Sequence, residues 1–174
     1  MNTITKLYEE VSNKTLLIMR GIPSSGKSTT IKQLVPNDQI FSADKFFERS
    51  GTYVFDRNLL GVAHNTCKSG VEKAMSDGKT PIAVDNTNTT VKEVVPYIDL
   101  AEKYGYKVVF VESKRPEWVK TSELLKNKEQ NWTELEEMAE FFYLDNKKTH
   151  NVPKETILAM FKRWVPTDEL EMLL

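Results

Sequence analysis

Short apolar runs alternate with longer amphipathic segments over the first two thirds of the chain. Each apolar run has the length of a strand, and the amphipathic segments carry their apolar residues mostly at helical spacing. The predicted strands are residues 15–19, 39–42, 81–85 and 107–111. Because strands that alternate with helices build parallel sheets with right-handed crossovers, this pattern predicts an α/β fold with a parallel sheet.

Helical periodicity dominates the last third of the chain. The first helix is expected to run to about Val35, residues 1–14 to form a short helix or lead-in, and residues 45–57 to be irregular. Further helices are predicted over residues 58–75, 91–104, 115–127, 132–148 and 153–164, with one or two turns over 167–174. The chain shows no repeat and no convincing boundary. We therefore expect a single domain over residues 1–174, with C-terminal helices over about 113–174.

A glycine-rich loop follows the first predicted strand directly. Residues 21–28 read GIPSSGKS and fit the pattern G-x-x-x-x-G-K-[ST], with a strand before and helical register after. Such a loop folds tightly around an anion, so that its amides and the new helix N-terminus point at phosphate oxygens. We call residues 21–28 the phosphate loop. The residues expected to hold a nucleotide are Gly21, Ser24, Ser25, Gly26, Lys27, Ser28 and Thr29.

Composition adds a few limits. The 174 residues carry a formal charge of −1, so we expect no global basic field and no tight nonspecific binding along duplex nucleic acid. The only cysteine is Cys67, which excludes an internal disulfide and indicates a reducing compartment. No apolar run approaches the length of a membrane span, and the polar N-terminus lacks a signal-peptide core. The expected location is the cytoplasm, or a host cytoplasm, without membrane association.

Two aspartates follow predicted strands, at the edge where open parallel sheets bind ligands. Asp85 ends the third strand, where a carboxylate helps Ser28 to hold Mg²⁺, directly or through water. The alternative is an aspartate in an ordinary strand-end turn. Asp44 follows the second strand, where it can accept the proton of a substrate hydroxyl that attacks the γ-phosphorus. Asp44 can also serve as the N-cap of a short helix, and both roles can coexist.

Neighbouring residues argue against two classes of nucleotide hydrolase. ATPase motors usually follow the strand-end aspartate with a glutamate that activates water, but here Asn86 follows Asp85. Residues 127–130 and 146–149 both begin Asn-Lys but lack the final aspartate of the guanine-reading Asn-Lys-x-Asp pattern. A regulatory GTPase is therefore not expected.

Three segments carry a family resemblance: residues 21–28, 41–44 and 84–88. They resemble the kinase domain of phage polynucleotide kinases, and more closely the small P-loop kinases that carry AAA-family or zeta-toxin-like names. Those relatives also have a stretch similar to residues 55–65, and the resemblance covers residues 15–112 well and 132–164 more loosely. It implies a three-layer P-loop kinase fold with a helical lid, ATP and Mg²⁺ as cofactors, and Asp44 as general base.

The chain departs from this family pattern around the lid. Phage enzymes carry arginine next to the base and on the lid, whereas here Ala43 precedes Asp44 and the candidate lid, residues 145–153, has lysines. Lys147 and Lys148 are the predicted lid cations, although lysine lacks the bidentate fork of arginine. A solvated helix end is the alternative for both lysines. Because residues 113–131 look like an insertion, Arg115 is another candidate cation.

The residues expected to contact the phosphate acceptor carry less specific sequence signals than the phosphate loop does. In the resembling family the position of His64 faces the acceptor, although a surface histidine is the plainer interpretation. Asn86, Thr87 and Asn88 offer polar groups where an acceptor would lie, and local turn hydrogen bonds are the competing explanation. The aromatic residues after Asp44 suit either base stacking or core packing. They are Phe46, Phe47, Tyr53 and Phe55.

The resemblance implies an ATP-dependent kinase whose acceptor is a hydroxyl of nucleic acid, with a polynucleotide 5′-hydroxyl end preferred. A nucleoside, a nucleotide or a hydroxymethylated base in DNA is the alternative acceptor. An ATP-binding switch or slow ATPase that recruits a partner is the alternative from another class. The sequence does not indicate an oligomeric state.

Overall fold

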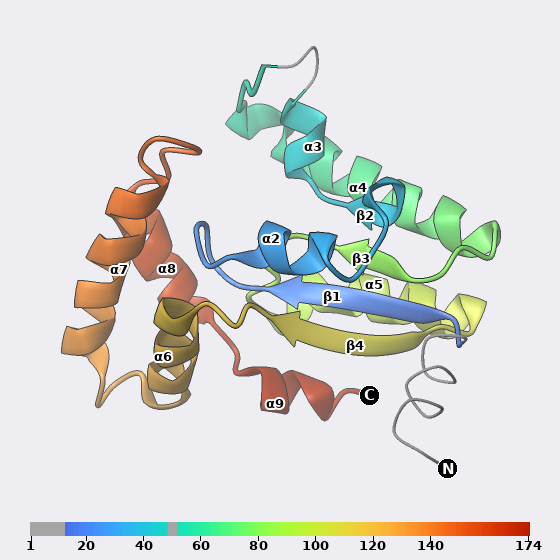
Figure 1. The fold of residues 1–174 in the computed structure, drawn as a ribbon. Helices are drawn as coiled ribbons and strands as arrows, with labels where there is room; N and C mark the ends of the chain where they lie inside the picture. The colour runs from blue at the N-terminus through green and yellow to red at the C-terminus, as the bar shows by residue number, and fades with distance from the viewer. Residues whose placement is uncertain (1–12, 49–51) are drawn as a thin grey trace.

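The computed structural model describes residues 13–48 and 52–174. The lead-in expected over residues 1–14 therefore lies almost wholly outside the described residues. A four-stranded sheet forms the centre, in the order β2-β3-β1-β4, and all of its pairings are parallel (Figure 1). The strands are β1 (Thr15–Arg20), β2 (Ile40–Phe41), β3 (Ile82–Val84) and β4 (Lys107–Glu112). The predicted α/β fold with a parallel sheet is confirmed.

Helices cover both faces of this sheet. Alternate residues of a strand point to opposite faces, and Leu17 and Met19 of β1 pack with Ile31 of α2 (Lys27–Lys32). On the other face, Leu16 and Ile18 join the core formed with three further helices. These are α4 (Leu60–Ser76), α5 (Val91–Tyr104) and α9 (Thr167–Glu171). The result is a three-layer arrangement in which β1 is central and fully covered.

The segment after β2 is more regular than its sequence pattern predicts. Residues 45–57, expected to be irregular, contribute most of the short helix α3 (Asp44–Phe47) and the start of the 3-10 turn η3 (Arg57–Leu59). Phe47 anchors α3, because its side chain is buried with Ala43, which precedes α3, and with Ala63 of α4. A second 3-10 turn, η1 (Asn37–Gln39), precedes β2.

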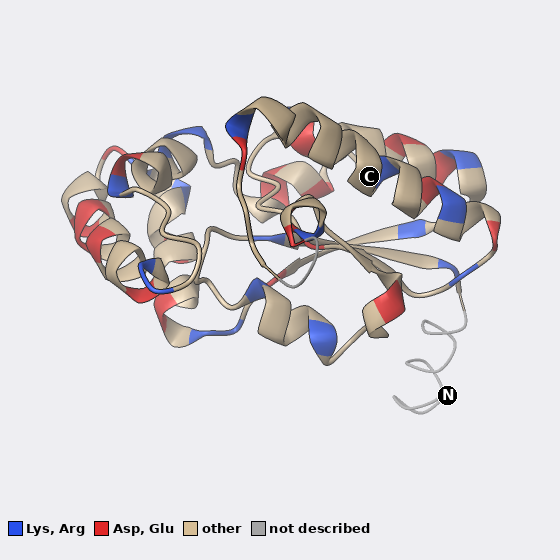
Figure 2. Cartoon of the chain, turned by 90° about the horizontal axis from the view of Figure 1, so that it is seen from above, with Lys and Arg blue, Asp and Glu red and all other residues tan. Residues whose placement is uncertain are grey.

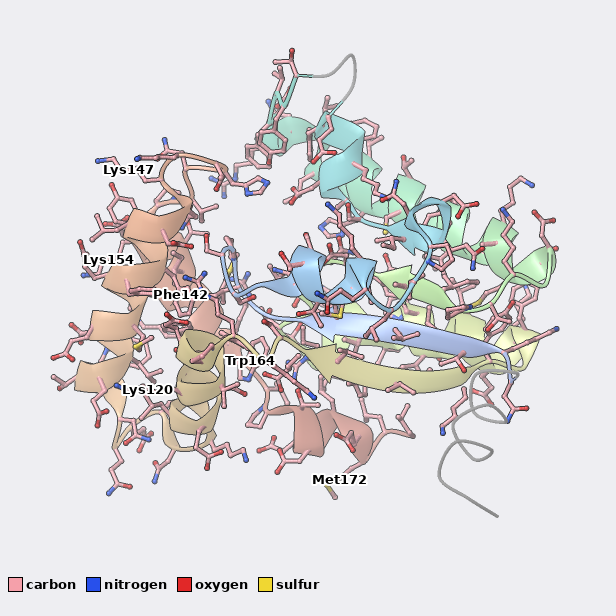
Figure 3. All side chains as sticks on the ribbon, in the orientation of Figure 1. Lys120, Phe142, Lys147, Lys154, Trp164 and Met172 are labelled. Carbon is pink, nitrogen blue, oxygen red and sulfur yellow. The ribbon has the colours of Figure 1, made fainter. Side chains whose placement is uncertain are left out.

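The C-terminal third forms a helical region with its own core. Its elements are α6 (Pro116–Leu124), η4 (Leu125–Asn127), α7 (Trp132–Asn146) and α8 (Lys154–Arg163). Trp118 lies edge-on to Trp164, with ring centroids 5.1 Å apart, and to Phe142 at 6.2 Å. Figure 3 shows Phe142 among these helices and Trp164 where they approach the sheet. Ile22 of the phosphate loop is buried in the same core, so the loop and the helical region share packing.

Arg20, at the end of β1, connects the sheet to the C-terminal segment. Its side chain is fully buried and donates to the Asn88 carbonyl at 2.8 Å, the Thr89 carbonyl at 3.1 Å and Thr167 Oγ1 at 2.8 Å. The guanidinium carbon also lies 4.0 Å from the ring centroid of Trp164. Burial lowers the pKa of Arg20 to about 10, and Glu112 opposes that shift. Arg20 therefore remains charged at neutral pH.

None of the helices in the described part of the chain has the length and apolar character needed to cross a membrane.

Replacing Arg20 should destabilise the fold. The Arg20→Met variant removes the donor of the Asn88 carbonyl and one of the two donors of the Thr89 carbonyl, which also accepts from the Val165 amide. This loss should lower the free energy of unfolding by about 3 kcal/mol. Urea denaturation at neutral pH measures this loss. The matched control is Arg57→Met, because Arg57 is exposed on η3 and its loss should change stability by less than about 0.5 kcal/mol. Equal stabilities of the two variants would show that the Arg20 contacts contribute little.

Candidate active site

The phosphate loop contains positions with a left-handed backbone. Gly26 adopts φ 98°, and a Cβ atom there would lie 2.5 Å from Ser113 Oγ. Ser24 is also left-handed, with φ 68°. The loop is held by the Ser25 amide, which donates to the Ile22 carbonyl at 3.1 Å, and by the Gly21 amide, which donates to the Thr87 carbonyl at 3.2 Å. Glycine at position 26 is thus a steric requirement, and the loop is tied to the strand end of β3.

Polar groups gather on the inner side of this loop. Lys27 Nζ donates to the Ile22 carbonyl at 3.0 Å. Burial lowers the pKa of Lys27, while the negative charges of Asp85 and Asp44 raise it. Ser25 Oγ is buried and has no hydrogen-bond partner among the described residues. A cation and unpaired donors at a helix N-terminus form an arrangement that binds anions.

Ser28 and Asp85 lie together at the start of α2. Ser28 Oγ donates to Asp85 Oδ2 at 2.9 Å, and the second carboxylate oxygen, Oδ1, is buried without a hydrogen-bond partner in the described part of the chain. The Asp85 amide donates to the Phe41 carbonyl at 2.8 Å, which fixes this strand end against β2. Oxygen ligands of this kind suit Mg²⁺, so the two residues fit the predicted metal-binding pair.

Asp44 begins α3, while Ala43 occupies the N-cap position. The Asp44 carboxylate is exposed and accepts a hydrogen bond from Tyr53 Oη at 3.4 Å. The Ala43 amide donates to Asn86 Oδ1 at 2.9 Å, which ties the loop after β3 to the residue before Asp44. Lys27, Asp44 and Asp85 thus all lie beyond the carboxyl ends of neighbouring parallel strands, β1, β2 and β3.

Comparison with known proteins agrees with this geometry. The family model described as an AAA domain matches residues 16–139. The chain belongs to this AAA domain family. Human NEDD4-binding protein 2 is 39% identical over 100 residues, a match that covers 56% of this chain and 6% of that protein. The family match supports a P-loop nucleotide-binding domain. The match covers so little of the relative that the properties of that protein do not transfer to this chain.

In the loop after β3 of this AAA domain, the side chains of Asn86 and Asn88 already have hydrogen-bond partners within the protein. Besides its bond to the Ala43 amide, Asn86 contacts Cys67 Sγ through Nδ2 at 3.7 Å. Asn88 is buried with φ 48°, and its Nδ2 donates to the Met19 carbonyl at 2.7 Å. Thr87 supports the phosphate loop through its carbonyl. The acceptor contacts assigned to Asn86, Thr87 and Asn88 stay predictions, beside these turn and loop bonds.

Arg115 is the basic residue of the helical region that contacts the phosphate loop. Its guanidinium donates to the Ser24 carbonyl and to Asp145 Oδ2, the latter at 3.0 Å, and lies 5.3 Å from the ring centroid of Phe141. The hydrogen bond that Arg115 donates to Asp145 is the main cause that raises the pKa of Arg115. Arg115 thus links the phosphate loop to α7.

The other predicted cations and His64 lie farther out. Lys147 and Lys148 are both exposed in the turn that follows α7, and Figure 3 shows Lys147 at the end of that helix. His64 is exposed on α4. No hydrogen bond joins these three side chains to Lys27, Asp44 or Asp85 within the described residues. Their roles in lid and acceptor binding stay predictions.

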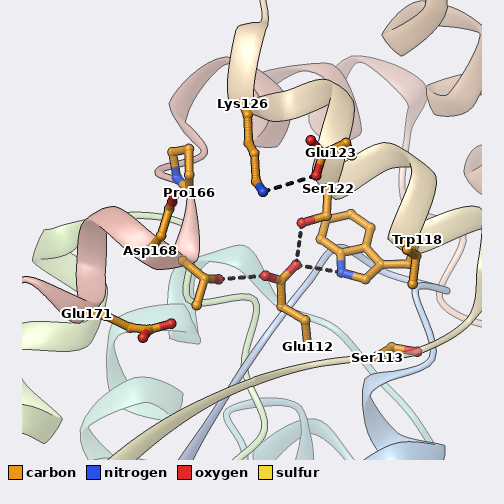
Figure 4. Close-up of a pocket in the computed structure, with 11 residues that line it drawn as sticks. Glu112, Ser113, Trp118, Ser122, Glu123, Lys126, Pro166, Asp168 and Glu171 are labelled. Atoms are coloured by element: carbon orange, nitrogen blue, oxygen red, sulfur yellow. Dashed lines mark hydrogen bonds and ion pairs between the residues drawn. The ribbon is translucent and has the colours of Figure 1, made fainter.

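A pocket of about 340 Å³ lies beside β4, α6 and α9 (Figure 4). Its lining includes four carboxylates, from Glu112, Glu123, Asp168 and Glu171. Glu112 accepts hydrogen bonds from Trp118 Nε1 at 2.9 Å, Ser122 Oγ at 2.7 Å and Thr167 Oγ1 at 2.6 Å. This carboxylate is therefore a structural acceptor, and the acidic lining does not suit phosphate.

Sequence reasoning missed several residues that shape the site. Arg20 carried one signal, since a charged residue at the end of an apolar run must find buried partners. Ile22 and Ser113 carried no such signal, because their roles depend on contacts with distant segments. Of the aromatic group after Asp44, Phe47 is buried in a small core, whereas Phe55 is 52% exposed.

The Gly26→Ala variant should lose nucleotide binding. A methyl group at φ 98° and 2.5 Å from Ser113 Oγ forces the loop open. We expect affinity for ATP to fall at least about tenfold, since the loop amides would no longer converge on phosphate. Isothermal titration calorimetry measures the change.

Gly61→Ala is the matched control for this loss. Gly61 lies on α4, and a Cβ atom there meets nothing within 4 Å. Alanine favours a helix over glycine by about 1 kcal/mol, so this variant should bind ATP normally. Equal affinities of the two variants would contradict the steric argument.

Proposed function

We propose that this AAA domain is a kinase that transfers the γ-phosphate of ATP to a hydroxyl group of nucleic acid. The observation that carries the proposal is the place of Asp44, an exposed carboxylate just after β2 whose neighbour Ala43 is hydrogen-bonded to Asn86, the residue after Asp85. A carboxylate opposite a phosphate loop supplies the base that a hydroxyl acceptor requires. The family match supports nucleotide binding, and the resemblance to polynucleotide kinases supports the choice of acceptor.

The proposed transfer step gives each of these side chains a separate role. Asp44 takes the proton of the acceptor hydroxyl while that oxygen forms its bond to the γ-phosphorus of ATP. The bond between the γ-phosphorus and the bridging oxygen breaks, and ADP leaves with the electron pair. Lys27 offsets the charge that develops on the phosphoryl oxygens. Ser28 and Asp85 would hold Mg²⁺, which supplies further charge neutralisation when bound.

The residue after Asp85 favours transfer over hydrolysis. Asn86 replaces the glutamate that would activate water, and its side chain is bonded to the Ala43 amide and Cys67. Arg115 is the best-placed candidate for the cation at the lid, since it already contacts the Ser24 carbonyl. Lys147 and Lys148 are the alternatives if the turn after α7 moves inward.

Charge distribution bears on the acceptor. Figure 2 shows Lys and Arg spread over many elements of the described chain, not gathered on one of them. A protein that tracks a duplex depends on many phosphate contacts, whereas one that acts on a strand end needs few. The dispersed positive charge supports a polynucleotide 5′-hydroxyl end as the preferred acceptor. Separately, the single cysteine supports a cytoplasmic location. A nucleoside, a nucleotide or a hydroxymethylated base stays the alternative acceptor.

The Asp44→Asn variant tests the proposed base. With γ-labelled ATP and 5′-hydroxyl oligonucleotides of RNA and DNA, we expect kcat to fall by about 10² to 10⁴-fold and ATP affinity to persist. Oligonucleotides that carry a 5′-phosphate are the matched control, since they lack only the acceptor. Unchanged transfer to every acceptor would show that Asp44 is not the base. Label found only in free phosphate would favour a slow ATPase or switch.

Removal of the Asp85 carboxylate tests the metal assignment. Asp85→Ala deletes one of two oxygen ligands, so half-maximal activity should require roughly tenfold more Mg²⁺. A magnesium titration of kcat measures this shift. A titration curve identical to that of the wild type would refute the assignment of Asp85.

A further inference from the structure

Tyr53 lies between the proposed base and the turn that follows α7. Its hydroxyl donates to Asp44 Oδ1 at 3.4 Å. Its ring meets the His150 ring edge-on, with centroids 5.3 Å apart and planes at 84°. One side chain thus contacts both the carboxylate on the acceptor side and the lid, two parts of the molecule that no helix or strand connects directly.

Tyr53 is held in this position by the segment around α3. The Val54 amide donates to the Phe47 carbonyl at 2.9 Å, and the ring of Tyr53 lies 6.4 Å from that of buried Phe47. Burial raises the pKa of Tyr53 to about 12, and the negative charges of Asp44 and Glu48 add to the shift. At neutral pH the phenol therefore keeps its proton, and its O–H donates a hydrogen bond to the carboxylate.

His150 is presented by a turn that Asn146 organises. Asn146 is fully buried, and its carbonyl accepts the amides of Thr149 and Asn151, both at 3.0 Å. Its Oδ1 accepts the Val152 amide at 2.8 Å. These hydrogen bonds close the turn on both sides of His150. The turn therefore holds the His150 ring against the ring of Tyr53.

We propose that Tyr53 is the positioning residue for Asp44, and that its ring and that of His150 form the contact by which the lid closes over the acceptor side. This inference rests on the proposed kinase function. A carboxylate at the exposed start of a short helix has free rotation unless a donor fixes it, and the Tyr53 hydroxyl is that donor. The bond of 3.4 Å is long, as catalytic hydrogen bonds often are before substrate binds.

The Tyr53→Phe variant separates positioning from packing, because it removes only the hydroxyl. We expect kcat to fall about tenfold with an unchanged KM for ATP. In an Asp44→Asn background the same change should cause no further loss, since Tyr53 acts through Asp44. Full activity of Tyr53→Phe, or additive losses in the double variant, would overturn the positioning role.

Tyr104→Phe is the matched control. The Tyr104 hydroxyl donates to Glu72 Oε1 at 3.3 Å, so the control removes a tyrosine–carboxylate bond of similar length at the far end of α5. We expect its kinetics to equal those of the wild type. A loss equal to that of Tyr53→Phe would mean that general destabilisation is being measured.

The ratio of free phosphate to transferred phosphate tests the contact between the rings of Tyr53 and His150. His150→Ala should raise the ratio of free phosphate to transferred phosphate several-fold, because water enters a site that closes poorly. His150→Phe keeps a ring at this position and should restore the wild-type ratio. An unchanged ratio in His150→Ala would overturn the closing role.

Proton NMR tests the ring contact without any substrate. The chain has two histidines, so the Hε1 resonance lost in His150→Ala is assigned, and Tyr53→Leu should move it. A wild-type protein that phosphorylates no acceptor defeats the proposed function, and the positioning role with it, even where this resonance moves. An active wild type with unaffected Tyr53 and His150 variants defeats this inference alone.

Discussion

Arg20 carries a positive charge into a part of the protein that water does not reach. Such a charge is stable only where hydrogen bonds and a face of π electrons replace water, and here two carbonyls, a threonine hydroxyl and Trp164 do so. Because these partners come from the loop after β3 and from the C-terminal segment, the charge fixes both against the end of β1. The carboxyl edge of the sheet, where the site lies, takes its shape from this arrangement.

The charges of the site itself are arranged differently. Lys27 is hydrogen-bonded to a carbonyl of its own loop and Ser28 to Asp85, so these groups have partners before any phosphate arrives. A triphosphate must displace the bond from Lys27 to Ile22 and compete with Asp85 for Ser28. Before a ligand binds, the backbone of the loop is held in part by the hydrogen bonds of the Gly21 and Ser25 amides.

The extent to which the sequence predicts this site depends on how local each determinant is. Phosphate-loop residues lie within eight consecutive positions and follow a strand, so their arrangement was predictable. The strand-end aspartates were predictable from the rule that parallel strands share one functional edge. Arg115 is different, because its contact with Ser24 depends on where α6 begins, 91 residues along the chain. Asn86 and Asn88 fit a turn or a ligand equally well, and only tertiary contacts give their partners.

Ile22 belongs to two parts of the molecule at once. It is a variable position of the phosphate-loop pattern, and its side chain is buried in the core of the helical region with Trp118 and Phe142. A ligand that fixes the backbone of the loop must therefore also limit the opening of that core. Thermodynamic linkage makes this reciprocal, so nucleotide should slow amide hydrogen exchange in α7, on residues that it never touches.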